Sequence, residues 1–378
     1  MKIIETALAF GALVTVAAAA PVLDFPGQGE ARDQQHAVFV MSNDAESNHV
    51  IAYERTQYGT LLSPRKYSTD GRGSGGNVDP LASQGSLTLS ADRSLLLAVN
   101  AGSGTLSVFR VFGSHLALTD VVPTGGSEPN AVAQHDKLVY VLNTAGSSSV
   151  VGFHLFEGKL VRLPDSQRFL SGNDTNSASL AFSADGRYLV VTERATNKLD
   201  LFKVLDDGRL SALVSNASVG PGAFAVTFVK DTAIVAETGA GGPDSSAMSS
   251  YSIAPNGTLV AVSPSVPTLG TANCWNVVTP DGRFVYASNS GSASISGFQI
   301  KAGGALAPLP GTVVGFNPSG STNLDIAISA DGAYLYSLNA GTGTIGSFAI
   351  RASDGSLTSL GVTHGLPAAA GLNGIAAN

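Results

Sequence analysis

Two glutamates stand at positions where similar segments of this chain carry asparagine. Short apolar segments recur along the sequence, and five of them end in Asn, whereas two end in Glu193 and Glu237. Carboxylates that share a cavity repel each other and raise one pKa, which is how an acid/base pair is made. Arg194 follows Glu193, and its planar guanidinium is suited to a substrate carboxylate. The pattern predicts acid/base catalysis; the alternative is two solvated glutamates, or glutamates paired with Arg194 or Lys198.

Other polar and aromatic residues occupy equivalent places in the recurring segments. The single tryptophan lies in the stretch Asn273-Cys274-Trp275-Asn276, where it predicts either a stacking surface for a ligand or a core side chain. Cys274 alternates to the opposite face and is expected as a small buried hydrophobe. The candidate substrate-binding residues are Arg194, Asn130, Trp275, Asn276, Asp325 and Asn143.

Several classes of site lack a sequence signal. The six histidines have no metal-ligand spacing, and there is no Gly-X-Ser-X-Gly elbow, phosphate loop or dinucleotide fingerprint. We therefore expect no metal and no cofactor. The formal net charge is −7 without a basic cluster, which argues against nucleic-acid binding. The expected partner is a small-molecule ligand or substrate, and the expected oligomeric state is a monomer.

A repeat of about 50 residues supplies the elements that position these side chains. Each copy has an apolar strand, a Ser-Ala-Asp-Gly type turn, a second strand, a Gly/Ser-rich turn and a third strand that ends in Phe. The clearest copies span residues 87–109, 180–202, 277–298 and 326–348. Such runs between Asp-Gly and Gly-Ser turns specify antiparallel hairpins. No sustained 3.6-residue apolar period follows the first twenty residues, so the fold class is all-β.

The end of the second strand marks each copy of the repeat. It falls at Asn43, Asn100, Asn143, Glu193, Glu237, Asn289 and Asn339, with spacings of 57, 43, 50, 44, 52 and 50 residues. Seven copies, each with a more polar fourth strand, predict a seven-bladed β-propeller of four-stranded antiparallel blades. First-strand starts and second-strand ends then meet at one mouth of a central channel, which is the expected site.

The two ends of the chain have separate signals. The first copy lacks an opening strand, and residues 374–377 resemble residues 325–328, so the C-terminal strand is expected to close the ring. Residues 1–20 have the pattern of a secretory signal peptide. Residues 21–35 form a lead-in, and residues 36–378 a single propeller domain.

Export is also favoured by three sequons, which begin at Asn173, Asn216 and Asn256. A single cysteine excludes an internal disulfide, so the exported chain must be stabilised by packing and strand pairing. We expect a secreted glycoprotein, extracellular or associated with the cell wall, with no transmembrane segment.

The repeat motifs resemble those of a known family. Residues 279–286 (TPDGRFVY) and 183–188 (SADGRY) are similar to motifs of the seven-bladed lactonase propellers, which include cycloisomerase-type 6-phosphogluconolactonases and carboxy-cis,cis-muconate cyclases. The resemblance implies a lactone hydrolase or a muconate-type cycloisomerase. Where family members show Pro-His-Ala and Pro-Arg-His, this chain has Pro129-Asn130-Ala131 and Ser177-Ala178-Ser179.

Two functions follow from these observations. The first is an enzyme that acts on a small carboxylated or lactone-containing metabolite, with Glu193 or Glu237 as acid/base and Arg194 as the carboxylate-binding group. The alternative is a non-catalytic extracellular or cell-surface propeller that binds a small molecule, a lipid or a partner protein. The absent family His and Arg favour the alternative, and the resemblance favours the enzyme.

Overall fold

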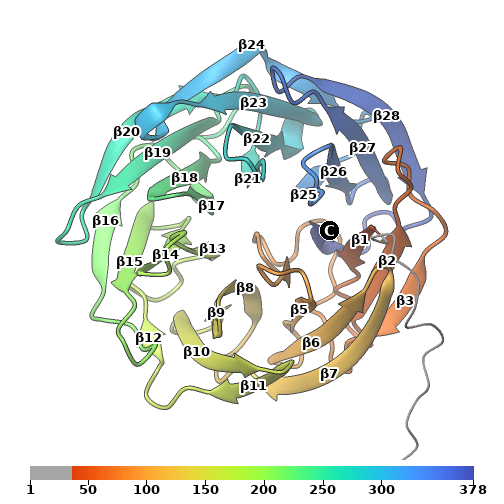
Figure 1. Cartoon of the computed structure of the whole chain (residues 1–378). Helices are drawn as coiled ribbons and strands as arrows, with labels where there is room; N and C mark the ends of the chain where they lie inside the picture. Colours follow the sequence, from red (N-terminus) through yellow and green to blue (C-terminus); the bar gives the residue numbers. More distant parts are fainter. Residues whose placement is uncertain (1–35) are drawn as a thin grey trace, which may run out of the picture. The chain divides into compact units, whose positions relative to one another are not determined.

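Short apolar strands separated by tight turns fold into seven antiparallel sheets that surround a central channel (Figure 1). The computed structural model describes residues 36–378. The predicted signal peptide (1–20) and lead-in (21–35) lie outside the described residues. Each sheet is one blade, and the prediction of a seven-bladed, all-β propeller is confirmed.

The strands follow one another outward from the channel in blades two to seven. Blade two contains β4 (Leu87–Leu89), β5 (Leu95–Asn100), β6 (Thr105–Phe112) and β7 (His115–Pro123). Blade three contains β8 (Pro129–His135), β9 (Leu138–Asn143), β10 (Ser149–Phe156) and β11 (Lys159–Arg162), with β12 (Arg168–Phe169) also paired to β10. Blade four contains β13 (Ser177–Phe182), β14 (Tyr188–Glu193), β15 (Lys198–Lys203) and β16 (Val214–Ala217).

The later blades repeat this order. Blade five contains β17 (Ala223–Val229), β18 (Thr232–Glu237), β19 (Ala247–Ile253) and β20 (Leu259–Pro267). Blade six contains β21 (Asn273–Val278), β22 (Phe284–Asn289), β23 (Ser294–Ile300) and β24 (Leu306–Phe316), with short 3₁₀ turns at Ser290–Ser292 and Ala302–Gly304. Blade seven contains β25 (Asn323–Ile328), β26 (Tyr334–Asn339), β27 (Thr344–Ile350) and β28 (Leu357–His364).

The first blade is built from both ends of the described chain. Its order is β29 (Asn373–Ala377), β1 (Ala37–Met41), β2 (His49–Glu54) and β3 (Arg65–Ser68). Phe39 pairs with Ala376 across the β1–β29 ladder, and the backbone N–H of Asn378 donates to the Ala37 carbonyl at 3.0 Å. The C-terminal strand therefore closes the ring, as predicted.

The second strand of each blade is largely buried. Every residue of β5 and β22 is buried. The hydroxyls of Tyr140, Tyr286 and Tyr336, at equivalent positions in three blades, donate to the carbonyls of Gly208, Gly355 and Gly59 in adjoining turns. These repeated contacts fix each blade against the next.

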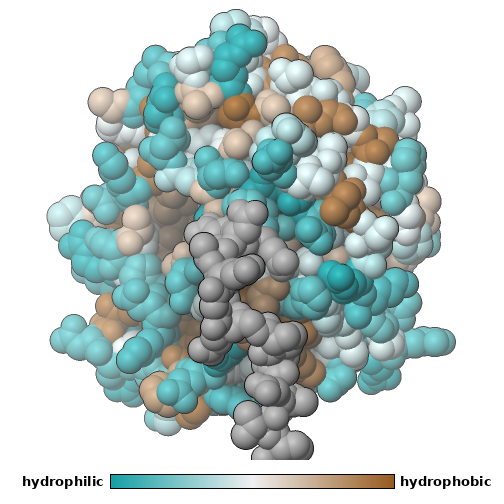
Figure 2. All heavy atoms as spheres, turned by 45° about the vertical axis from the view of Figure 1, so that its right-hand side comes forward, coloured by the Kyte–Doolittle hydropathy of each residue, from teal (hydrophilic) through white to brown (hydrophobic). Residues whose placement is uncertain are grey.

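The outer surface is mixed in polarity. On the face that Figure 2 shows, hydrophobic residues lie scattered among hydrophilic ones, as is normal for a folded domain. Within residues 36–378, no helix is long and apolar enough to span a membrane.

Candidate functional site

The residues at the second-strand ends anchor the segments that cross from one blade to the next. In blade two, Asn100 Nδ2 donates to Ser107 Oγ at 2.8 Å, and Ser107 Oγ donates to the carbonyl of Thr69 in the preceding crossover at 2.6 Å. Blade six repeats this chain with Asn289 and Ser296. A Cβ added to Gly71 in the crossover would lie 2.3 Å from the Asn100 side chain, so this close approach requires glycine.

Glu237 makes the equivalent anchor in blade five. Its side chain is 0% exposed. Oε1 accepts hydrogen bonds from Gly220 N (3.0 Å) and Ser249 Oγ (2.5 Å), and Oε2 accepts one from Ser265 Oγ (2.8 Å). The carboxylate thus holds the crossover and the two outer strands of its own blade, and it does not face the channel.

Glu193 forms a more acidic version of this anchor in blade four. It is also 0% exposed, and its neighbour on the third strand is Asp200, where blades two, five and six have Ser107, Ser249 and Ser296. The backbone N–H of Ser171 donates to Glu193 Oε1 (2.9 Å) and to Asp200 Oδ2 (3.0 Å), and Ser171 Oγ donates to Glu193 Oε2 (2.6 Å). Lys198 Nζ donates to Ser171 Oγ at 2.9 Å.

The carboxyls of Glu193 and Asp200 influence each other's ionisation. Burial, together with the hydrogen bond to Glu193, raises the pKa of Asp200 to about 7, while the pKa of Glu193 is lowered. Burial opposes that lowering, and hydrogen bonds to Asp200, Ser171 and Thr196 outweigh it. The pair lies inside blade four. Glu193 binds Ser171 and Glu237 binds Gly220, so the two glutamates hold different crossovers.

A plug fills the mouth at which the first strands start. It is the connection between β3 and β4, residues 69–86, and Figure 1 shows this connection reaching the centre of the ring. Gln84 forms a two-pronged contact with β21, because Asn276 N donates to its Oε1 and its Nε2 donates to the Asn276 carbonyl, both at 2.9 Å. Trp275 Nε1 donates to the Ser83 carbonyl at 2.8 Å.

The opposite wall holds the plug as well. The backbone N–H of Gln84 donates to the Ala178 carbonyl at 2.9 Å, and Ser83 Oγ donates to the Asn130 carbonyl at 2.8 Å. Asn130 Nδ2 donates to the Ser177 carbonyl at 2.8 Å. Three expected substrate-binding residues, Asn130, Trp275 and Asn276, therefore lie at the plug and bind it.

Titratable groups gather around Asp79 of the plug. Asn373 Nδ2 donates to Asp79 Oδ1 at 3.1 Å. Burial raises the pKa of Asp79 to about 7, against the opposing effects of Asn373 and the Arg194 charge. Burial also raises the pKa of Asp325 to about 8, and the negative charge of Asp79 adds to the rise. The pKa of Cys274 is raised by burial, with a further contribution from Asp79.

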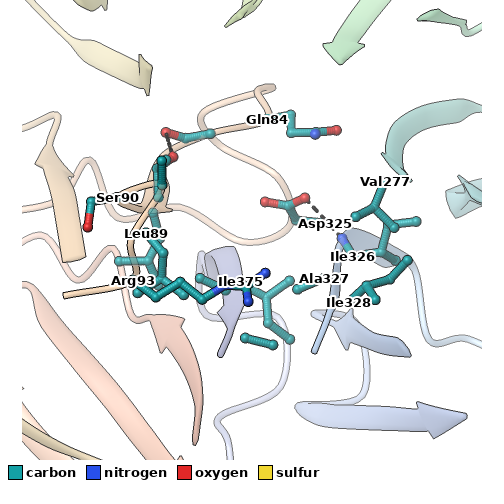
Figure 3. Close-up of a pocket in the computed structure, with 16 residues that line it drawn as sticks. Gln84, Leu89, Ser90, Arg93, Val277, Asp325, Ile326, Ala327, Ile328 and Ile375 are labelled. Carbon is teal, nitrogen blue, oxygen red and sulfur yellow. Dashed lines mark hydrogen bonds between the residues drawn. The ribbon is translucent and has the colours of Figure 1, made fainter. Parts of the chain in front are cut away.

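A cavity of about 340 Å³ runs from the plug toward the opposite mouth of the channel. Gln84 and Gly85 of the plug form its inner end, and β4, β25 and β29 form much of its wall (Figure 3). Asp325 lies in this wall and is 4% exposed. Its Oδ1 accepts the backbone N–H of Ile326 at 2.9 Å. Arg93, in the turn between β4 and β5, lines the outer end.

The expected site residues therefore separate into groups. Asp325 lines the cavity. Arg194 lies within electrostatic reach of Asp79, and its guanidinium stands 5.8 Å from the Phe224 ring centroid. Asn143 anchors a crossover, since Thr124 Oγ1 donates to its Oδ1 at 2.7 Å. Within residues 36–378, no three His, Cys, Asp or Glu side chains gather so as to hold a metal ion.

Sequence reasoning missed Asp79, Gln84 and Arg93. The sequence does contain a signal for Asp79 and Gln84. The spacing of 57 residues between the second-strand ends at Asn43 and Asn100 is the longest of the six spacings, which indicates an extra segment between them. The extra residues form the plug. The signal for Arg93 is weaker: it replaces the glycine of the Asp-Gly turn motif that other blades have.

The three sequons differ in accessibility. Asn173 and Asn256 are exposed. Asn216 is half-buried, and its Nδ2 donates to the carbonyls of Leu199, Val214 and Gly257 while its Oδ1 accepts from Leu259 N. A glycan on Asn216 would disrupt these contacts.

No protein-family model matches the chain, and a comparison with curated proteins finds no match. Solved structures share its fold. A candidate 6-phosphogluconolactonase from Bacteroides uniformis superposes with a TM-score of 0.68 at 20% identity, over 92% of this chain and 100% of that one. The periplasmic gluconolactonase of Pseudomonas aeruginosa gives 0.67 at 18% identity, over 90% and 99%. The fold resemblance predicted from the repeats is confirmed.

Proposed function

We propose that the chain hydrolyses lactones in the central channel, with Asp325 as the general base. The observation that carries the proposal is a carboxyl group, 4% exposed, with a pKa raised to about 8, in the wall of a channel cavity of about 340 Å³. Structural neighbours with this fold include proteins described as lactonases. The same fold can host unrelated chemistry, so the cavity and its carboxyl group are the basis of the proposal.

The raised pKa makes the Asp325 carboxylate a stronger base than an ordinary aspartate, whose pKa is about 3.9. In the proposed reaction the carboxylate takes a proton from water as the oxygen attacks the lactone carbonyl carbon. The ring C–O bond breaks, and protonated Asp325 returns the proton to the leaving alkoxide, which gives a hydroxy acid. No redox cofactor takes part.

Two neighbours support this role. Asp79 raises the pKa of Asp325, so its own charge state sets the strength of the base. Gln84 Nε2 uses one N–H for the Asn276 carbonyl, which leaves a second N–H available to a substrate carbonyl oxygen. Glu193 and Glu237 have no part in this mechanism, because each is 0% exposed and holds a crossover.

The test is a lactone-hydrolysis assay of the wild type and two variants. Asp325→Asn should lower kcat/KM by at least about 100-fold, a typical contribution of a general base. Glu237→Gln, the matched carboxyl-to-amide control outside the cavity, should keep kcat/KM within about threefold while its thermal stability falls. Equal rates for wild type and Asp325→Asn would reject Asp325 as the base.

A binding module without catalysis is the second candidate. The specific observation in its favour is the plug, which occupies the mouth where the expected site lay. Saturable binding of a lactone without turnover, in wild type and Asp325→Asn alike, would support this alternative.

We also propose that the mature chain begins after residue 20 and acts outside the cell as a monomeric glycoprotein. The exposed sequons at Asn173 and Asn256 and the single buried cysteine support this. After expression in a eukaryotic secretory host, glycopeptide mass spectrometry should find glycans on Asn173 and Asn256 and an unmodified Asn216. Full occupancy of Asn216 would contradict the structural argument.

A further inference from the structure

The turn between β4 and β5 carries an arginine where three other blades carry glycine. Gly186, Gly282 and Gly332 occupy this position with φ values of 70°, 71° and 69°, and Arg93 has φ 59°. This left-handed region of backbone conformation favours glycine, so an arginine at this position has an unfavourable backbone conformation. An observed backbone outlier beside a cavity is a reason to look for function.

The turn arginines of blades two and four differ in their surroundings. In blade four the arginine comes one residue later, as Arg187, and pairs with Asp185 of its own turn. In blade two, Ser94 Oγ instead donates to Asp92, at 2.8 and 2.9 Å to its two oxygens. Among the described residues, no hydrogen bond or ion pair involves the Arg93 side chain.

The Asp331 carboxylate lies within electrostatic reach of Arg93 but already forms a salt bridge with Arg55. Asp331 raises the pKa of Arg93, while the burial of the guanidinium lowers it more. The Arg55 guanidinium holds Asp331 Oδ2 at 2.9 Å. Arg93 is therefore a partly buried cation that makes no ion pair of its own among residues 36–378, and Figure 3 shows its side chain extending toward Ile375 on the cavity wall. An anionic ligand group would supply the missing charge.

The wall between Asp325 and Arg93 carries mainly apolar side chains, besides the hydroxyls of Thr88 and Ser90. It includes Leu89, Val277, Ala327 and Ile328. Its one threonine hydroxyl, that of Thr88, lies within hydrogen-bond distance of the carbonyls of Gly85 (3.2 Å) and Val132 (3.1 Å). A ligand with many hydroxyls would leave them unpaired against this wall, at a cost in affinity.

The strand geometry sets the length of the ligand. Both Asp325 and Ile328 of β25 line the cavity, and the three steps between them span about 10 Å along its wall. A ligand that reaches both ends presents its lactone carbonyl at Asp325 and an anionic group near Arg93.

We propose that Arg93 determines specificity by binding a carboxylate on the substrate, an inference that rests on the proposed function. The substrate is then a lactone with an apolar body rather than a polyhydroxylated sugar lactone. The cavity, its apolar wall and the unpaired cation define this class together.

The experiment compares three probes: a γ-butyrolactone with an alkyl side chain ending in a carboxylate, its methyl ester, and D-glucono-1,5-lactone. Wild type should favour the carboxylate over the ester by at least about tenfold in kcat/KM, mostly through KM, and should turn over the sugar lactone most slowly. Arg93→Gly should remove the preference for the carboxylate, and Arg93→Lys should retain part of it.

The variants separate binding from folding. Arg93→Gly restores the glycine of the other blades, so its melting temperature should be equal to or above that of wild type. Arg187→Gly removes the turn arginine of blade four, which pairs with its own Asp185, and should leave the preference for the carboxylate unchanged. Calorimetric titration of the carboxylate and the ester into Asp325→Asn measures the same preference without turnover.

The outcomes distinguish the two proposals. Lactone turnover with the same carboxylate-to-ester ratio in wild type and Arg93→Gly overturns the role of Arg93 and leaves the proposed function standing. A tenfold preference in binding without any turnover overturns the proposed function and supports Arg93. Faster turnover of glucono-1,5-lactone than of the carboxylate probe overturns the assigned substrate class.

Discussion

Asn100 and Glu237 serve one purpose at the second-strand ends, but they anchor the crossover with opposite polarity. Asn100 acts through Ser107, whose hydroxyl donates to a crossover carbonyl. Glu237 accepts the crossover N–H of Gly220 directly. The sequence showed that the two glutamates depart from the pattern, and it suggested catalysis. Residue type alone does not reveal whether the neighbouring backbone presents a donor or an acceptor, and this decides the role.

Replacing Glu237 with alanine should therefore destabilise the fold. Three donors, Gly220 N, Ser249 Oγ and Ser265 Oγ, would lose their acceptor in a buried site. We expect the free energy of unfolding to fall by about 3–5 kcal/mol, measured by urea denaturation. The exposed Glu46→Ala is the control and should change it by less than about 0.5 kcal/mol. Similar values for the two variants would contradict the anchoring role.

At the scale of elements, the repeat predicted the blades and their closure, because strand patterns and turn motifs are local properties. The position of the plug is not local. The residues 69–86 are rich in glycine and carry no strand pattern, and their place in the channel depends on contacts with Trp275 and Asn276, about 190 residues away. The cavity and its inner end could not be predicted for that reason.

The closing strand gives an element-scale prediction. Removing residues 371–378 deletes β29, its ladder with β1 and the wall contributed by Ile375, and leaves β1 as an unpaired edge on the channel. The melting temperature should fall by more than 10 °C, or the chain should fail to fold, in a thermal scan followed by circular dichroism. Asn378→Ala, which removes only the side-chain bond to Ala37 N at 2.7 Å, should lower it by a few degrees. An unchanged melting curve for the truncated chain would contradict closure by β29.

At the scale of the whole molecule, buried carboxyls set the pH dependence of stability. The pKa values of Asp79, Asp200 and Asp325 are raised to about 7, 7 and 8. An unfolded aspartate has a pKa of about 3.9. Between about pH 4 and pH 8 the folded state keeps protons that the unfolded state has released, so the free energy of unfolding falls as pH rises through this window.

At lower pH the opposite effect operates. The pKa of Asp185 is lowered to about 2 by hydrogen bonds to Ser183 and Arg187 that outweigh its burial, so its contribution is lost as pH falls from about 4 to 2. Stability should therefore be greatest near pH 4–5. The free energy of unfolding, measured by urea denaturation, should be several kcal/mol higher at pH 4.5 than at pH 8. Asp200→Asn should reduce this difference. Higher stability at pH 8 than at pH 4.5 would contradict the raised pKa values.

The channel chemistry depends on one of these carboxyls, so the most direct test is the pH dependence of kcat/KM for lactone hydrolysis. The base must be ionised, so kcat/KM should rise about tenfold per pH unit below an inflection near pH 8, because burial and the nearby Asp79 raise the pKa of Asp325 to about that value. Asp325→Asn should abolish the inflection together with most of the rate. An inflection near pH 4, or the same profile in wild type and Asp325→Asn, would contradict the assignment of Asp325 as the base.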